Sequence, residues 1–162
     1  MTPGGEYAKG RGMTGVWARM AALVLALALG LAGCGTGPQG GLHPGETAEI
    51  RALIQTYARV HDIPESLLHS VIQRESGYNA AARNGPYYGL MQILPQTART
   101  MGYEGPAEGL LDAETNLIYA GRYLRGAWIV SGGNEDAAIR WYAAGYYYEA
   151  KRLGLLEETG LR

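Results

Sequence analysis

Residues 75 to 92 read Glu75-Ser76-Gly77-Tyr78-Asn79-Ala80-Ala81-Ala82-Arg83-Asn84-Gly85-Pro86-Tyr87-Tyr88-Gly89-Leu90-Met91-Gln92. The stretch follows an apolar pattern of helical spacing, whose expected buried stripe is Leu67, Leu68, Val71 and Ile72. Glu75 falls on the same stripe, and Gly77 follows where a helix would end. We therefore predict a carboxylate at the last turn of a buried helix, beneath a loop led by Gly89.

The expected surroundings of Glu75 suit acid catalysis. Burial and the negative end of a helix dipole both disfavour the charged form of a carboxyl group. A carboxyl group that holds its proton near neutral pH is what a general acid needs. The alternative is a solvated glutamate at a frayed helix end, and the pattern favours the acid.

The segments around this stretch predict an all-α domain. Asp62, Asp112 and Asn134 stand where helix caps are expected, and Pro64 and Pro95 suit first helical turns. Tyr78 to Tyr88 is expected to be a loop, Gly121 to allow a close helix approach, and Gly145 to end a helix. The expected helices are residues 46–61, 64–75, 96–101, 113–131 and 135–144. No strand pattern or internal repeat competes.

The N-terminal segment has the layout of a secretory signal. Basic residues up to Arg19 precede an apolar run of about 12 residues, Met20 to Leu31, against the ~20 that a membrane-spanning helix needs. Leu31-Ala32-Gly33-Cys34 resembles the lipobox of bacterial lipoproteins, in which the cysteine is lipidated. We therefore expect a signal peptide at residues 1–33 that begins at Met1 or Met13.

Residues 34–45 are expected to be a lipidated Cys34 followed by a flexible, Gly-rich tether, with the catalytic domain at residues 46–162. The chain would then be periplasmic and anchored in a membrane. Because the residue after Cys34 is not Asp, we expect this to be the outer membrane. Two acyl chains suffice for stable anchoring.

Composition argues against other classes of function. A net charge of -1 and a pI near 6.3 give no case for nucleic-acid binding. Cys34 is the sole cysteine, and His43, His61 and His69 are scattered without zinc-type spacing. We expect neither a metal nor a cofactor.

Four motifs in order are similar to the catalytic domain of the soluble-lytic-transglycosylase (SLT) type, within the lysozyme superfamily. The resemblance covers roughly residues 48 to 152. The motifs are Glu75-Ser76 with Asn79; Gly89-Leu90-Met91-Gln92 with Pro95 and Thr97-Ala98; Asn116-Leu117 with Gly121 and Tyr123-Leu124; and Trp141-Tyr142-Ala143-Ala144-Gly145. The resemblance implies a lysozyme-like arrangement of helices around an active-site cleft.

The resemblance also implies a reaction, the non-hydrolytic cleavage of the β-1,4 bond between N-acetylmuramic acid and N-acetylglucosamine in peptidoglycan. Glu75 would protonate the leaving oxygen and then accept the proton of the muramoyl C6 hydroxyl, which gives a 1,6-anhydro end. Ordinary glycosidases need a second carboxylate. None of the candidates stands in a matching motif; they are Glu104, Glu108, Asp112 and Glu114.

The resemblance assigns the remaining site residues. Tyr142 would hydrogen-bond the catalytic glutamate. Ala143 replaces the asparagine usual in the fourth motif, which removes hydrogen bonds that normally brace that turn. The expected substrate contacts are Ser76, Asn84, Gly89, Met91, Gln92 and Tyr123, with packing as the alternative for Met91 and Tyr123.

Two other functions fit the sequence. The first is a hydrolytic muramidase, and the second is a catalytically weakened lipoprotein that binds peptidoglycan. The expected partners are glycan strands and, through Cys34, a membrane; no feature identifies a protein partner.

Overall fold

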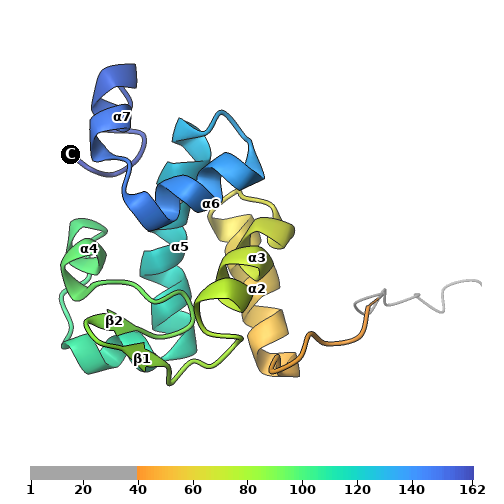
Figure 1. The fold of residues 1–162 in the computed structure, drawn as a ribbon. Coiled ribbons are helices and arrows are strands. Elements are labelled where there is room, and N and C mark those ends of the chain that lie inside the picture. The colour runs from red at the N-terminus through yellow and green to blue at the C-terminus, as the bar shows by residue number, and fades with distance from the viewer. Residues whose placement is uncertain (1–39) are drawn as a thin grey trace, which may run out of the picture. The chain divides into compact units, whose positions relative to one another are not determined.

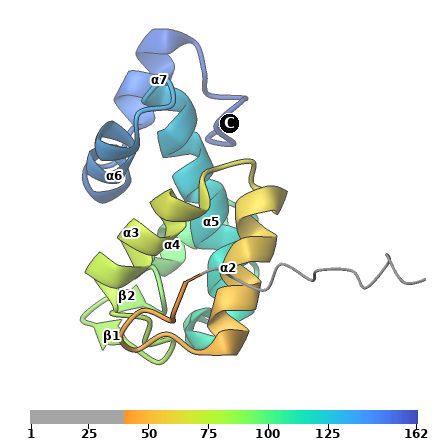
Figure 2. The same cartoon turned by 90° about the vertical axis from the view of Figure 1, so that its right-hand side faces the viewer.

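A computed structural model describes residues 40–162 of the chain (Figures 1 and 2). The predicted signal peptide, Cys34 and the first part of the tether lie outside these residues. Within the described part, no helix combines the length and the apolar character needed to cross a membrane.

The first two helices, α2 (Ala48–Val60) and α3 (Glu65–Glu75), pack against each other. Their buried side chains include Ile54 on α2 and the predicted stripe on α3. The predicted Asp62 cap is wrong, because α3 starts after Pro64 without a side-chain cap. Asp62 itself adopts φ 49°, and its Oδ2 pairs with Arg125 Nη2 at 3.2 Å. Gly77, at φ 56°, ends α3 as predicted and donates to the Ile72 carbonyl.

The predicted loop contains a small hairpin that the sequence pattern did not reveal. Strands β1 (Arg83–Asn84) and β2 (Tyr87–Tyr88) pair antiparallel, with Asn84 opposite Tyr87. Gly85, at φ 57°, and Pro86 form the two-residue turn, an order that suits a type II′ hairpin. Strands of two residues are too short to show an alternating pattern in the sequence. Because this hairpin is small, the fold is essentially all-α, as predicted.

The longest helix, α5 (Ala113–Val130), runs through the middle of the domain in both views (Figures 1 and 2). Asp112 caps it as predicted, accepting from the Thr115 amide at 2.8 Å. It contacts α2, α4 (Pro95–Thr100) and the 3-10 helix η1 (Ala107–Leu111). A Cβ at Gly121 would lie 2.5 Å from the His61 ring, so this glycine allows His61, at the end of α2, to approach α5 closely.

The last two helices are α6 (Glu135–Ala144), capped by Asn134 as predicted, and α7 (Tyr147–Leu153). Gly145, at φ 83°, separates them. Tyr146 is buried against α5 and donates to the Tyr123 carbonyl at 2.8 Å. A Cβ at Gly126 would lie 2.2 Å from the Tyr146 hydroxyl oxygen, so the missing side chain makes room for this contact.

The residues just before position 46, which the sequence pattern assigned to the tether, pack on the domain. The compact unit begins at Gly41. A Cβ at Gly45 would lie 2.4 Å from the Gly77 carbonyl oxygen, and the His43 ring stacks on Tyr78 at 5.6 Å. Buried Glu46 and Arg51 form an ion pair at 2.6 Å behind this contact. Residues 43 and 45 therefore have fixed contacts with the loop that follows α3.

Candidate active site

Glu75 is the last residue of α3, and its side chain is 24% exposed. It lines a pocket of about 270 Å³ with residues from β1, β2, α6 and the loop after β2: Asn84, Tyr87, Gln92, Tyr142 and Ala143. The Glu75 carboxylate is therefore less buried than the stripe of Leu67, Leu68, Val71 and Ile72 on which the sequence pattern placed it. Its place at the C-terminal end of a helix with a buried stripe is as predicted.

The Glu75 carboxylate is held by its neighbour. Oε1 accepts from Arg74 Nε at 3.0 Å and from Nη2 at 2.5 Å. The Arg74 side chain is 42% exposed, and an exposed pair of this kind contributes little to stability. Within residues 40–162, Oε2 accepts no hydrogen bond, so one carboxylate oxygen is available to a ligand.

A second pocket of about 280 Å³ adjoins the first and shares four lining residues with it: Tyr87, Gln92, Tyr142 and Ala143. It extends past Tyr123 and Thr97 toward Gly145. We call the two pockets together the cleft. Their shared wall joins them into one concavity, and Glu75 lines one of its two halves.

The backbone of Leu90 and Met91 joins the four motifs. The Ser76 hydroxyl donates to the Leu90 carbonyl at 2.7 Å. Asn116 Oδ1 accepts from the Met91 amide at 2.9 Å, and the Tyr142 hydroxyl donates to the Met91 carbonyl at 2.8 Å. One side chain from each of the other three motifs therefore fixes the second motif, and this holds the loop beside Glu75.

Tyr142 differs from its predicted role in one respect. Its hydroxyl donates to the Met91 carbonyl rather than to Glu75. Burial raises the pKa of Tyr142 well above its ordinary value, and the nearby Glu75 charge raises it further. The hydroxyl therefore stays a donor across the physiological pH range. Tyr142 therefore holds the loop through Met91 and lines the same pocket as Glu75.

Gly89 supports the same loop by having no side chain. Its φ is 76°, and a Cβ there would lie 2.3 Å from both Asn116 Nδ2 and the Leu110 carbonyl oxygen. Asn116 is fully buried and donates to the carbonyls of Tyr88, at 2.9 Å, and Leu110, at 2.8 Å. Asn116 can reach these carbonyls only because residue 89 is glycine.

The predicted substrate contacts divide into two groups. Asn84, Gln92 and Tyr123 line the cleft. Ser76, Gly89 and Met91 do not, and Met91 is fully buried, which favours its alternative role in packing. Groups of these three residues hold the loop, and their direct contact with a substrate stays a prediction.

Gln92 combines two features that are unusual in a folded protein. Its φ is 48°, a conformation that a non-glycine residue rarely adopts. Its Nε2 donates to the carbonyls of Gly89, at 2.8 Å, and Ala82, at 3.1 Å, which fixes the amide orientation. Oε1 is buried and has no partner among the described residues. Such an orphaned acceptor at a cleft wall is suited to a donor on a ligand.

Tyr87 and Ala143 were not assigned to the cleft from the sequence. Tyr87 is 43% exposed and lines both pockets, where an aromatic face can pack on a sugar ring. The Gly85-Pro86 turn beside it was a signal that this tyrosine stands at the tip of a projecting hairpin.

Ala143 is exposed and also lines both pockets. The turn that follows it is held by the Gly145 amide, which donates to the Trp141 carbonyl at 2.9 Å, and by the Tyr142 bond to Met91. The loss of bracing by a side-chain amide at position 143 stays a prediction, and the small side chain of Ala143 forms part of the cleft surface.

Glu75 is the sole carboxylate among the residues that line the cleft. Asp112 is used as the α5 cap, and Glu114 accepts from the Tyr57 hydroxyl at 2.9 Å. Glu104 and Glu108 do not line either pocket. Within residues 40–162, no second acid is placed to act with Glu75.

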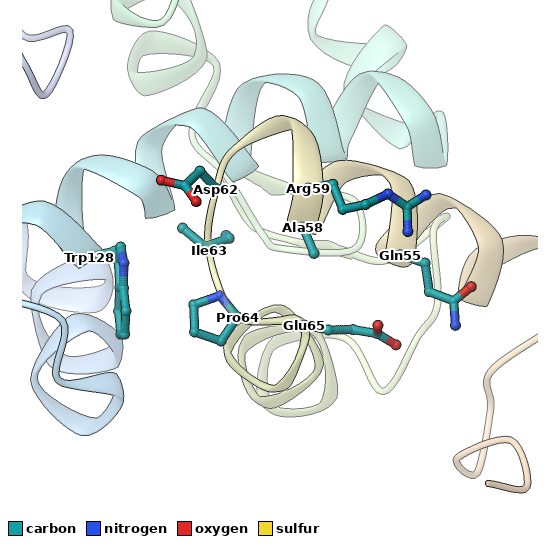
Figure 3. A pocket seen from close by; sticks show the side chains of 8 residues that line it. All are labelled: Gln55, Ala58, Arg59, Asp62, Ile63, Pro64, Glu65 and Trp128. Carbon is teal, nitrogen blue, oxygen red and sulfur yellow. The ribbon is translucent and has the colours of Figure 1, made fainter. Parts of the chain in front are cut away.

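A larger concavity of about 500 Å³ lies at the other end of α3, beside Pro64 and Glu65. Figure 3 shows the Trp128 ring on one side of it and Arg59, Gln55 and Glu65 on the other. No residue of the four motifs lines it. Its volume alone gives no chemistry, so the cleft at Glu75 is the better candidate.

A group of possible metal ligands lies outside the cleft. His43, Glu46 and His69 place their ligand atoms within 4.8 Å of one another. The sequence spacing did not indicate this group, because residues 43 and 69 come together only in the folded chain.

The sequence matches the family described as Transglycosylase SLT domain over residues 52–154. No solved structure matches the chain. The match contains all four motifs that converge on the Leu90–Met91 backbone and the cleft beside Glu75. The chain therefore belongs to the Transglycosylase SLT domain family.

Proposed function

We propose that this protein is a lytic transglycosylase that cleaves the β-1,4 bond between N-acetylmuramic acid and N-acetylglucosamine in peptidoglycan and leaves 1,6-anhydro ends. The family match supports a transglycosylase-type enzyme that acts on peptidoglycan. The observation that carries the finer proposal is the single carboxylate of the cleft.

Glu75 acts twice in this proposal. In its protonated form it gives a proton to the glycosidic oxygen, which leaves with the bond electrons. The resulting carboxylate accepts the proton of the muramoyl C6 hydroxyl, and the C6 oxygen bonds to C1. Atoms balance without water, so no second acid is needed to activate a water molecule. A glycan that fills the cleft would displace water from Glu75, and this supplies the desolvation that a general acid needs.

The identity of the products tests this proposal against both alternatives. We expect the 162-residue chain with Cys34→Ser, incubated in detergent with purified sacculi, to release fragments with anhydromuramoyl ends. Mass spectrometry distinguishes these ends from reducing ends by the mass of one water molecule. Reducing ends would establish a muramidase, and sedimentation with sacculi without release would leave a binding protein.

Gln92 is proposed to accept a hydrogen bond from a sugar hydroxyl or acetamido N–H through Oε1. We expect Gln92→Met to lower kcat/KM by about tenfold, because one hydrogen bond contributes about 1–1.5 kcal/mol. Asn79→Ala is the control, since Asn79 also makes a loop hydrogen bond but does not line the cleft. Equal kcat/KM in Gln92→Met and in the unmodified protein would remove Gln92 from substrate binding.

The N-terminal features lead to a proposal about location. We infer a lipid-anchored periplasmic protein, attached through Cys34 to the outer membrane, from the signal-like residues 1–33 and the lipobox resemblance. The docked residues from Gly41 on leave a short tether, which would keep the cleft near its membrane.

A further inference from the structure

The cluster of His43, Glu46 and His69 brings together two imidazoles and one carboxylate, and none of the three residues lines the cleft. His43 is exposed, Glu46 has a fully buried side chain, and the His69 side chain is 13% exposed. The His43 and His69 rings lie 4.8 Å apart between centroids. We propose that these three residues bind a divalent cation of the zinc class, which fastens the end of the tether to α3.

The carboxylate of Glu46 has one acceptor position left, and it faces His69. A carboxylate offers about four lone-pair positions. On Oε2, two are used by the Arg51 Nη2 donor at 2.6 Å and the His43 amide at 2.8 Å. On Oε1, one is used by Arg51 Nε at 2.6 Å. The remaining position is on Oε1, which lies 3.9 Å from His69 Nδ1.

Arg51 has two effects on this site. It orients the ligand carboxylate, as hydrogen bonds to metal-binding carboxylates commonly do. Its positive charge also opposes a cation, so most of the affinity must come from the two imidazoles. We therefore expect binding that is weaker than in a closed structural zinc site.

The hydrogen bonds of His69 favour the tautomer whose Nδ1 lone pair could bind a metal ion. Nε2 faces Glu65 Oε1 at 3.4 Å, an arrangement in which the Nε2 proton points to a carboxylate. Nδ1 then carries the lone pair, which accepts from the Tyr78 hydroxyl at 2.9 Å. A cation would take this lone pair once the Tyr78 hydroxyl turned away. A carboxylate behind a ligating histidine is a frequent partner in metal sites.

The distances require only a local adjustment. Zinc–ligand bonds of ~2.0–2.1 Å place tetrahedral ligand atoms about 3.3 Å apart, against the present separations within 4.8 Å. Rotation of the exposed His43 side chain can bring its nitrogen closer, and a small movement of the His69 ring must shorten the 3.9 Å between His69 Nδ1 and Glu46 Oε1. Solvent can complete the coordination. Imidazole ligands favour zinc over Ca²⁺ and Mg²⁺, which prefer oxygen.

Zinc titration by calorimetry tests the site on the 162-residue chain with Cys34→Ser, purified in detergent without a histidine tag. We expect one zinc per chain, and at least about tenfold weaker binding in His43→Ala and in His69→Ala. His43→Ala is decisive, because an exposed side chain is removed and the fold is kept. Glu157→Gln, an exposed carboxylate change elsewhere, should bind like the parent chain.

Hydrogen exchange measures the proposed fastening separately. Zinc should slow amide exchange in residues 41–46 of the parent chain but not in His43→Ala. Undiminished zinc binding in His43→Ala, no saturable binding by the parent chain, or equal binding of Mg²⁺ would each overturn the proposal. Peptidoglycan cleavage is not a readout here, so the result is independent of the proposed function.

Discussion

Glu75→Gln is expected to lower the rate of sacculus cleavage by about 10²–10⁴-fold, the range that a positioned general acid contributes. Glutamine keeps the size of the side chain but can neither give the proton nor take it back. The measurement is the initial rate of release of muropeptides from sacculi. Because Glu75 is partly exposed and its ion partner Arg74 is exposed, the thermal midpoint should stay close to that of the parent chain.

The matched control for this variant is Glu108→Gln. It makes the same chemical change at Glu108, an exposed residue that does not line the cleft. Glu108 was also one of the candidates for a second acid in the sequence. Glu108→Gln should cleave at the parent rate. Activity of Glu75→Gln within about tenfold of the parent rate would show that another group supplies the proton, and a comparable loss in Glu108→Gln would contradict the one-carboxylate mechanism.

Local signals were sufficient for much of the fold. The end of α3 at Gly77 and the caps at Asp112 and Asn134 depend on interactions within a few residues, and the structure confirms them. The Asp62 cap failed because α3 begins only after Pro64, and the exposed Asp62 side chain pairs with Arg125 instead. The contacts of the residues before position 46 were also beyond local signals, since Gly45 meets Gly77 and His43 meets Tyr78 only in the folded chain.

The site was predictable in its residues but less so in their roles. Glu75, Asn84, Gln92, Tyr123 and Tyr142 do meet at the cleft. What the pattern could not reveal is that the Leu90–Met91 backbone needs partners for its own polar groups. Ser76 and Tyr142 are used for that purpose, while the Gln92 acceptor is left free. Burial of a loop backbone is a tertiary property, and periodicity carries no information about it.

Asn116 is the residue whose loss should destabilise the domain most through hydrogen bonding. It is fully buried and satisfies the Met91 amide and the carbonyls of Tyr88 and Leu110. Asn116→Ala leaves the Met91 amide and the Leu110 carbonyl without a partner, while the Tyr88 carbonyl still accepts from the Ile93 amide at 3.1 Å. Each unsatisfied buried group costs about 1–3 kcal/mol, so we expect the free energy of unfolding to fall by about 2 kcal/mol or more. That is a large part of the ~5–15 kcal/mol typical of a domain. Urea unfolding followed by circular dichroism measures the loss.

Asn134→Ala separates this effect from the loss of an ordinary asparagine, because Asn134 makes one exposed cap bond, to the Ala137 amide, and should cost about 1 kcal/mol. The two variants also differ in what they do to the cleft. The Asn116 side chain joins the Gly89–Gln92 loop to η1 and α5. Its loss should therefore lower the rate of cleavage even without urea, at a temperature where most of the chain is folded. Asn134→Ala should then cleave at the parent rate. A cost for Asn116→Ala no larger than that for Asn134→Ala would mean that water replaces the three bonds, and that the remaining bonds of Ser76, Tyr142 and Gln92 suffice to hold the loop beside Glu75.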